Sequence, residues 1–248
     1  MNRFFVDADQ ISDGAVHIYG EDVNHIRHVL RMRPGEEIQV SRGDEWEYTC
    51  EILPYENDRE VAARIVDAQK PGRELPGQIY LFQCLPKSDK MNLIVQKAVE
   101  LGVYAIVPVV SRRCVVKLDE KKAGAKVNRW NAVARSAAKQ SMRMIVPEVL
   151  PVRTLEEAFS LAEKEQTDVR LMPYESAEDM EFTRSLLGGI RPGQKIAVLI
   201  GPEGGFEDSE VQAGRDHGFS VITLGRRILR TETAGMTVLS ILMYLLDS

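Results

Sequence analysis

Two apolar runs that end in glycine constrain the fold of this chain more than any other feature. Residues 198–206 read VLIGPEGGF, and residues 222–225, about twenty positions later, read ITLG. Gly201, Gly204 and Gly205 tolerate positive φ and a close approach of the backbone, so peptide groups of the turn can contact a ligand at the carboxyl end of a strand. The two runs therefore predict two strands of one sheet that end beside a common pocket.

The glycine turns do not fit the common phosphate-binding motifs. They match neither GxGxxG nor GxxxxGK followed by Ser or Thr, and Pro202 removes one backbone donor. A nicotinamide-dependent oxidoreductase would also call for an acidic residue about 20 positions beyond its glycines. The turns therefore favour a different nucleotide-like ligand, with a plain strand-to-helix turn as the alternative.

Strand-like and helix-like segments alternate from residue 78 onward. Apolar runs predict strands, and apolar residues spaced three and four apart predict helices. We expect strands near 79–85, 105–110, 169–172, 195–201 and 220–225, and helices near 91–102, 121–142, 154–165, 208–217 and 231–246. Such alternation predicts an α/β domain with a parallel sheet.

Residues 1–72 show a different pattern, that of a small β-barrel with one helix. Short β-like runs are expected at 3–6, 15–18, 37–41, 45–53 and 61–68. Residues 21–33 carry apolar side chains at helical spacing before Pro34 and Gly35 end the pattern. Prolines and glycines within residues 71–77 mark a boundary, which predicts two domains, 1–72 and 73–248.

Composition narrows the class of protein. Hydrophobic residues make up 44% and charged residues 28%, and no apolar run reaches the roughly 18 residues that span a membrane. The first residues lack an apolar signal-peptide core, so we expect a cytoplasmic globular protein. Cys50, Cys84 and Cys114 lack CxxC spacing and are expected to be free core thiols. His25 and His28 lie one helical turn apart, but two ligands do not make a metal site, and no metal is expected.

The formal net charge of −5 argues against a nucleic-acid partner, but the charge is unevenly distributed. Residues 84–145 contain 13 Lys and Arg against 4 Asp and Glu, whereas residues 1–76 contain 9 against 16. The basic stretch is either a polyanion-binding face or a solvated helical surface. Trp130 lies at helical spacing with Val127 and Ala134, which favours core packing over base stacking. The candidates for RNA contact are Arg27, Arg31, Arg33, Lys87, Arg112, Arg113, Arg129 and Arg143.

The last helix is expected to begin directly after three arginines. Thr231 is the expected N-cap, with Glu232 in the first turn. The expected apolar face of this helix comprises Val238, Ile241, Leu242 and Leu245. Capping explains Thr231 and Glu232, but it gives no role to Arg226, Arg227 or Arg230.

Several segments together carry a family resemblance. They are IGPEGGF at 200–206, LGRRILRTETA at 224–234, KSDKMNLIVQKAVELGV at 87–103, RW…AAKQSMR…VPEV between 129 and 149, and HIRHVLRMRPGE at 25–36. Over essentially the whole chain, this set closely resembles the bacterial 16S ribosomal RNA uridine-N3 methyltransferases of the SPOUT (trefoil-knotted) superfamily. The resemblance implies a PUA-like RNA-binding β-barrel followed by an α/β domain whose last third forms a deep knot. Sequence reasoning alone would reject a knot, because knots are essentially absent among folds.

The resemblance also implies a cofactor, partners and a site. In the family, the knot loops hold S-adenosylmethionine in a bent conformation, a homodimer completes the site, and the substrate is 16S ribosomal RNA of the small subunit. Carried onto this sequence, the cofactor-binding positions are Leu171, Pro173, Ile200, Gly201, Pro202, Glu203, Gly204, Gly205, Leu224, Gly225, Ile228, Leu229, Arg230 and Thr233.

The chemistry of such a reaction assigns two candidate catalytic residues. A sulfonium methyl donor brings its own electrophile, so neither a metal nor a nucleophilic cysteine is required. The uridine N3 proton must leave, and a positioned cation would stabilise the resulting anion. Arg230 is the candidate cation, with loop ordering or a phosphate contact as its alternative role. Glu203 is a candidate base or a partner of the methionine ammonium, with a purely structural role as the alternative.

Two other functions remain open at this point. One is methylation of another ribosomal or transfer RNA target by an enzyme of the same superfamily. The other is a non-catalytic, ribosome-associated RNA-binding protein, which would explain the barrel and the basic segment but not the paired glycine turns.

Overall fold

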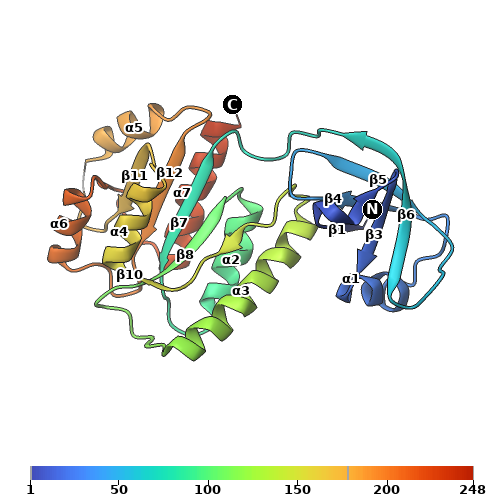
Figure 1. The fold of residues 1–248 in the computed structure, drawn as a ribbon. Coiled ribbons are helices and arrows are strands. Elements are labelled where there is room, and N and C mark those ends of the chain that lie inside the picture. Colours follow the sequence, from blue (N-terminus) through green and yellow to red (C-terminus); the bar gives the residue numbers. More distant parts are fainter. Residues whose placement is uncertain (1, 178, 248) are drawn as a thin grey trace. The chain divides into compact units, whose positions relative to one another are not determined.

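The computed structural model describes residues 2–177 and 179–247, and the chain divides into two compact units. Unit 1 comprises Met1–Glu74 and Ala138–Val146, and unit 2 comprises Leu75–Ala137 and Pro147–Ser248. Figure 1 shows the helices and strands of both units, and each unit is built around a sheet of its own.

Unit 1 contains a six-stranded sheet in the order β1-β4-β5-β6-β3-β2. Its elements are β1 (Arg3–Phe5), η1 (Ala8–Gln10, a 3-10 helix), β2 (Ile11–Ser12), β3 (Ala15–Tyr19), β4 (Glu37–Ser41), β5 (Glu47–Ile52) and β6 (Glu60–Gln69). β1 is parallel to β4, and the other neighbours are antiparallel. Alternate residues such as Val16, Ile18, Ile38 and Val40 are buried, so one face of the sheet covers the core of unit 1.

The helix expected over residues 21–33 is shorter than predicted. It consists of α1 (Glu21–Asn24) and a π-helical turn, η2 (His25–Val29). The Leu30 N–H donates to the His25 carbonyl at 2.8 Å, and Arg31 then adopts a φ of 54°, a left-handed conformation that cannot continue a right-handed helix. The helix therefore ends before Pro34 is reached.

Residues 138–146 belong to unit 1 although they follow its strands by about 70 residues. The Glu74 carboxylate accepts hydrogen bonds from the Arg143 guanidinium at 2.6 Å and from the Met144 N–H at 2.7 Å. The Arg3 guanidinium donates to the Arg143 carbonyl at 2.7 Å and forms a buried ion pair with Glu47. Polar contacts between distant residues thus hold this segment, and no local sequence pattern predicts them.

Unit 2 contains a seven-stranded sheet in which all neighbouring strands are parallel, as predicted. The strand order is β10-β8-β7-β12-β11-β13, and β9 pairs with β8. The strands are β7 (Gln78–Cys84), β8 (Ala105–Val110), β9 (Glu148–Val149), β10 (Arg153–Thr154), β11 (Val169–Pro173), β12 (Lys195–Ile200) and β13 (Ser220–Ile222). Continuous burial along β7 and β12 is typical of a parallel sheet covered on both faces.

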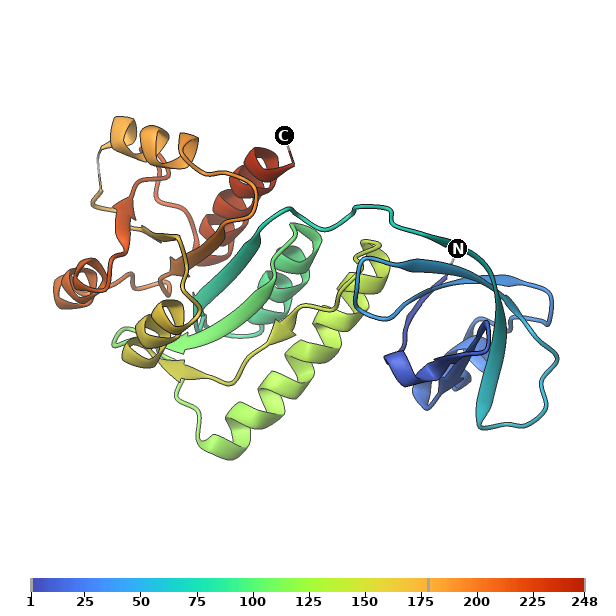
Figure 2. The ribbon, with the colours of Figure 1, turned by 45° about the horizontal axis from the view of Figure 1, so that its top comes forward.

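Six helices accompany this sheet within the described residues. They are α2 (Lys90–Glu100), α3 (Glu120–Gln140), α4 (Leu155–Lys164), α5 (Met180–Gly188), α6 (Asp208–Asp216) and α7 (Thr231–Leu246). Figures 1 and 2 show α2 and α7 on one face of the sheet and α4 on the other. Helix α5 was not predicted, and its Phe182 is 45% exposed, so it lacks a strong buried stripe.

Helix α7 packs against α2 and β12. Of the four residues expected on its apolar face, Val238 and Leu242 are buried, and Ile241 and Leu245 are half-buried. Within the described residues, no helix is both long enough and apolar enough to cross a membrane.

The strand order determines where a ligand can bind in unit 2. β11 lies between β12 and β13, so the carboxyl ends of these three parallel strands meet at one edge of the sheet. The chain leaves that edge through residues 201–206, which we call the glycine loop, and residues 223–230, which we call the arginine loop. Ligands of open α/β sheets bind at such edges.

Candidate functional site

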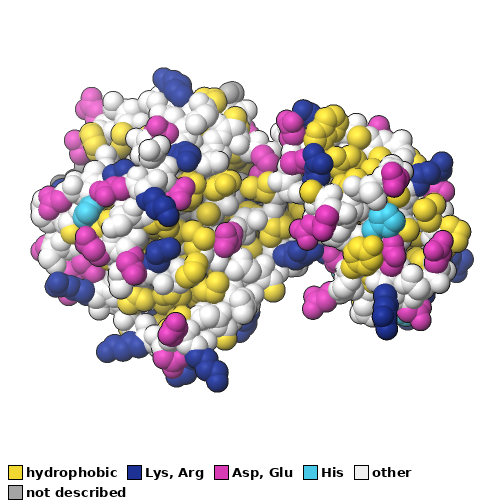
Figure 3. All heavy atoms as spheres, viewed as in Figure 1, with side chains coloured by type: hydrophobic (Ala, Val, Ile, Leu, Met, Phe, Trp, Pro, Cys, Tyr) yellow, Lys and Arg dark blue, Asp and Glu magenta, His cyan; other side chains and the backbone are white. Residues whose placement is uncertain are grey.

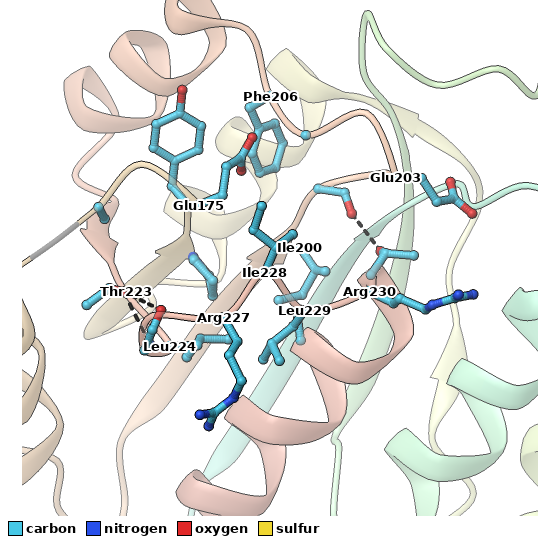
Figure 4. Close-up of a pocket in the computed structure, with 18 of the residues that line it drawn as sticks. Glu175, Ile200, Glu203, Phe206, Thr223, Leu224, Arg227, Ile228, Leu229 and Arg230 are labelled. Carbon is cyan, nitrogen blue, oxygen red and sulfur yellow. Dashed lines mark hydrogen bonds between the residues drawn. The ribbon is translucent and has the colours of Figure 1, made fainter.

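A cavity of about 1090 Å³ lies at this edge of the unit 2 sheet, between the glycine loop and the arginine loop (Figure 4). Twelve of the fourteen residues that the resemblance assigned to the cofactor line it, namely Pro173, Ile200, Gly201, Pro202, Glu203, Gly204, Gly205, Leu224, Gly225, Ile228, Leu229 and Arg230. Leu171 is buried within β11, and Thr233 is exposed on α7, so neither lines the cavity.

Glycine is required at two positions of the glycine loop. A Cβ atom at Gly201 would lie 3.0 Å from the ring of Phe206, which is almost completely buried and therefore cannot move aside. Gly205 has a φ of 66°, and a Cβ atom there would meet the carboxylate of Glu175. The Gly205 N–H closes the turn by donating to the Pro202 carbonyl at 2.9 Å. The loop thus keeps its backbone close to the cavity.

The arginine loop presents free backbone donors to the cavity. Gly225 has a φ of 108°, and its N–H donates to the Thr223 hydroxyl at 3.2 Å. Within the described residues, the N–H groups of residues 226–229 have no hydrogen-bond acceptor. Backbone donors need a partner, either water or a ligand, so this loop can bind the polar edge of a heterocycle.

One wall of the cavity is apolar. Figure 4 shows Ile228 and Phe206 directed into the cavity and Ile200 and Leu229 beside them. Ile228 is 87% exposed, so a ligand held here would bury an apolar side chain that the chain itself leaves uncovered. An apolar wall next to free N–H donors suits a flat heterocycle joined to a sugar.

Thr231 ties the start of α7 to the glycine loop. Its hydroxyl donates to the Gly201 carbonyl at 2.6 Å and accepts from the buried Gln83 side chain at 2.9 Å. The prediction that Thr231 caps α7 is therefore wrong. Arg230 is the N-cap residue, and Thr231 is the first helical residue, because the loop and Gln83 engage its hydroxyl.

Glu203 is held by the KSDK segment, residues 87–90, which lies outside the glycine loop. Its carboxylate accepts from the Lys87 N–H at 3.1 Å and pairs with the Lys90 ammonium at 3.1 Å. Lys90 also pairs with Glu232, in the first turn of α7, at 3.3 Å. Burial works to raise the pKa of Glu203, but backbone hydrogen bonds and Lys90 outweigh it and hold that pKa below its ordinary value. A carboxylate stabilised in this way is a weak base, so the geometry favours a structural role for Glu203.

Arg230 is exposed at the end of the arginine loop. Within the described residues it has no carboxylate at ion-pair distance, which leaves its guanidinium available to a ligand. Figure 4 shows that the side chains of Arg230 and Glu203 leave their loops on the same side.

The residues predicted to contact RNA are not equally available. Arg31, Arg33, Lys87, Arg112, Arg113 and Arg129 are exposed. Arg27 pairs with Asp58 at 2.8 Å and lies over the Tyr55 ring, and Arg143 is buried against Glu74 as described above. Arg113 donates to the Gly204 carbonyl at 2.9 Å, which places it beside the glycine loop.

The remaining predictions concern cysteines, tryptophan and metals. All three cysteines are free and buried, and Trp130 is only 3% exposed, as expected for core residues. His25 packs edge-on against the ring of Phe4. Within the described residues, no cluster of three His, Cys, Asp or Glu could hold a metal ion.

Sequence reasoning missed the residues that fix the loops. Gln83 and Lys90 act through contacts with residues far away in the sequence, and Glu232, expected only in the first turn of the last helix, also pairs with Lys90. Glu175 and Met180 line the cavity from a segment for which no element was predicted. The one signal available was the lysine-rich KSDK segment directly after the β7 run.

Comparisons with known proteins agree with this arrangement. Residues 73–243 match the RNA methyltransferase domain, and residues 18–66 match the RNA methyltransferase PUA domain. The chain is 35% identical, over 98% of its length and 96% of the relative, to ribosomal RNA small subunit methyltransferase E of Bacillus subtilis.

Two solved structures with bound cofactor have the same fold. The methyltransferase E of Neisseria gonorrhoeae bound to S-adenosyl methionine is 34% identical, with a TM-score of 0.84 over 99% of this chain and 98% of that chain. A methyltransferase structure from Legionella pneumophila in complex with the cofactor SAM is 31% identical, with a TM-score of 0.85 over 98% and 96% of the two chains. The expected fold class, a PUA-like barrel followed by a SPOUT α/β domain, is confirmed, and the chain belongs to the RNA methyltransferase family that includes ribosomal RNA small subunit methyltransferase E.

Proposed function

We propose that this protein transfers a methyl group from S-adenosylmethionine to N3 of a specific uridine in 16S ribosomal RNA of the small subunit. The observation that carries the proposal is the cavity between two strand-end loops, with free backbone N–H groups on one side and an apolar wall on the other. The bound cofactors of the two solved relatives support it. The uridine and its N3 position come from the family resemblance.

The residues present fit the cofactor. The free N–H groups of residues 226–229 suit the edge of an adenine, and Ile228 and Leu229 suit its face. Gly201 and Gly205 let the backbone of the glycine loop come close to a ribose. Bound there, S-adenosylmethionine would supply an electrophilic methyl group, and the protein needs no nucleophile of its own.

The protein must also stabilise the negative charge that develops on the uridine. Loss of the N3 proton leaves an anion that spreads over N3 and the two neighbouring carbonyl oxygens. An unpaired guanidinium such as that of Arg230 stabilises such an anion when it is fixed nearby. The low pKa of Glu203 and its pairing with Lys90 argue against a role as the base, so we assign Glu203 to holding the glycine loop.

The proposal includes partners and a location. We place the domain boundary after residue 72, with the first domain and the exposed basic residues of the second contacting RNA. A homodimer is part of the proposal and comes from the family resemblance. Light scattering coupled to gel filtration would test it. We also place the enzyme in the cytoplasm, where assembled small subunits are found.

The proposal is tested with S-adenosylmethionine labelled in its methyl group and small ribosomal subunits that lack the uridine-N3 methyl group. Mass spectrometry identifies the modified nucleoside. We expect label at N3 of one 16S uridine. Label at another position or in transfer RNA would mean that the enzyme has a different target. A chain that binds RNA but no cofactor would be a non-catalytic RNA-binding protein. Free 16S RNA in parallel shows whether an assembled subunit is required.

A further inference from the structure

We propose that Arg184, Arg226 and Arg227 form a phosphate-binding rim that holds the RNA backbone beside the target uridine. The inference rests on the proposed function and deepens it, because it assigns the residues that seat the substrate at the cavity. Arg226 and Arg227 belong to the arginine loop, and Arg184 belongs to α5. All three line the cavity and are exposed.

The rim arginines differ from Lys90 and Arg113, two other cations near the cavity, and resemble Arg230, which also has no ion pair within the described residues. Lys90 is neutralised by Glu203 and Glu232, and Arg113 donates to the Gly204 carbonyl. In contrast, no carboxylate of the described residues lies within ion-pair distance of the three rim arginines. Exposed guanidiniums that line one cavity and form no ion pair with a described residue keep their charge available, so a site built this way is suited to an anionic ligand.

The sign of this charge identifies the ligand. S-adenosylmethionine carries a sulfonium and an ammonium against one carboxylate, so its net charge is positive and a ring of unpaired arginines does not attract it. RNA carries one negative charge per nucleotide, and arginine binds phosphate with two parallel hydrogen bonds. The rim therefore complements the polyanionic substrate rather than the cofactor.

The directions of the side chains also favour an extended ligand. Figure 4 shows Arg227 leaving the arginine loop beside α7, on the side away from Glu175 and Phe206, whereas Arg230 points to the side of Glu203. Arg227 and Arg230 therefore do not converge on one small anion. The rim arginines, which come from α5 and from the arginine loop, can contact successive phosphates of a strand, which fixes the position of a base without reading its sequence.

The test compares wild-type protein with Arg226→Gln/Arg227→Gln and with Arg184→Gln. Arg215→Gln is the matched control, because Arg215 is an exposed arginine of α6 that does not line the cavity. Methyl transfer to small subunits lacking the uridine-N3 methyl group is measured at several salt concentrations, and cofactor affinity is measured by calorimetry.

We expect the double variant to raise the KM for subunits by about tenfold or more, since hydrogen bonds to charged groups are lost. The slope of log KM against log salt concentration should be smaller by about 0.7 for each phosphate contact that is lost. The value of kcat and the Kd for S-adenosylmethionine should stay close to wild type, because the substitutions change side chains alone and keep the backbone N–H groups that we assign to the cofactor. Arg226→Lys/Arg227→Lys should recover the salt dependence, because it keeps the charges, and Arg215→Gln should behave as wild type.

Two outcomes of the kinetic test would overturn the inference, and a third would overturn the proposed function. An unchanged KM and salt dependence in the double variant would show that the rim does not contact RNA. A weaker Kd for the cofactor with an unchanged KM for subunits would assign the arginines to the cofactor carboxylate. Absence of methyl transfer by the wild-type protein would defeat the proposed function instead. In that case filter binding of the same subunits tests separately whether the rim contacts RNA. Equal binding by wild type and double variant would reject the inference.

Discussion

The two loops that form the cavity differ in how firmly the rest of unit 2 holds them. The glycine loop is bound from three directions, by Lys90 and Lys87 at Glu203, by Arg113 at the Gly204 carbonyl and by Thr231 at the Gly201 carbonyl. Within the described part of the chain, the hydrogen bonds that hold the arginine loop lie at its two ends, where the Thr223 N–H donates to the Thr183 hydroxyl at 3.2 Å and the Arg230 carbonyl accepts from the Ala234 N–H of α7 at 2.8 Å. Between these ends its residues are exposed or half-buried.

This difference indicates a division of labour. A loop that is fixed before the ligand arrives loses little conformational freedom on binding, so its contacts contribute fully to affinity. A loop with free donors and unpaired arginines becomes ordered by what it binds. The glycine loop is therefore the preorganised half of the site, and the arginine loop is the half that responds to cofactor and RNA.

The largest effect is expected at the end of the arginine loop. Arg230→Ala should lower kcat by about 100- to 1000-fold at saturating subunits and cofactor, because a fixed cation no longer stabilises the uridine anion. Single-turnover methyl transfer measures this step without product release. Arg215→Ala, on the surface of α6, is the control. Unchanged turnover in Arg230→Ala would rule out a catalytic role for this guanidinium.

A smaller effect is expected from a substitution in the glycine loop, the preorganised half of the site. Gly201→Val forces a side chain against the buried ring of Phe206, and such overpacking costs about 1–3 kcal/mol. Because this strain displaces the backbone of the glycine loop, the Kd for S-adenosylmethionine should rise by at least about tenfold in a calorimetric titration. Gly124→Ala, in α3, is the control, since nothing lies within 4 Å of a Cβ atom there. Equal affinity in both variants would mean that the glycine loop is not part of the cofactor site.

The same division explains what could be predicted from the sequence. The strands and the two loops follow from apolar runs and from glycines that are neighbours along the chain, and the motif resemblance selects most of the residues around the cavity. Their roles in binding stay a prediction. The contacts that fix the glycine loop could not be found, because Lys87 and Glu203 are 116 residues apart and Gln83 and Thr231 are 148 apart.

Charge counting failed for a related reason. Arg143 was selected because it lies in a basic stretch, but its guanidinium is buried against Glu74, which comes from the segment between the two domains. Similarly, helix α5 begins at an Asp179 N-cap, but its half-exposed apolar residues give no clear helical stripe. Local patterns reveal which residues favour an element, but only the tertiary fold determines which charges are neutralised.

A smaller loss of cofactor affinity is expected when Lys90, which pairs with Glu203 of the glycine loop, loses its charge. Lys90→Met should release Glu203 and Glu232 and raise the Kd for S-adenosylmethionine severalfold, about the loss expected for one charged hydrogen bond. Lys90→Arg should restore most of the affinity, because it keeps the charge. Lys97→Met is the matched control, since Lys97 lies on the same helix and pairs with Glu100 at 2.7 Å. A change that affects thermal stability alone, equal in both Met variants, would show that Lys90 does not position the loop.

The smallest effect concerns the pH at which the glycine loop is held. The pKa of Glu203 is lowered in the folded protein, so the stability it contributes is present above its ordinary pKa of about 4.3 and is lost as the pH falls through the lowered value. At pH 6, Glu203→Gln should lower Tm by about 2 °C or less, since the carboxylate is partly exposed. The difference in Tm from wild type should shrink as the pH falls below the ordinary pKa and through the lowered one, because the wild-type carboxylate then becomes neutral as well. A difference that stayed constant with pH would assign the contribution of Glu203 to packing and neutral hydrogen bonds, and the glycine loop would then not depend on the ion pair with Lys90.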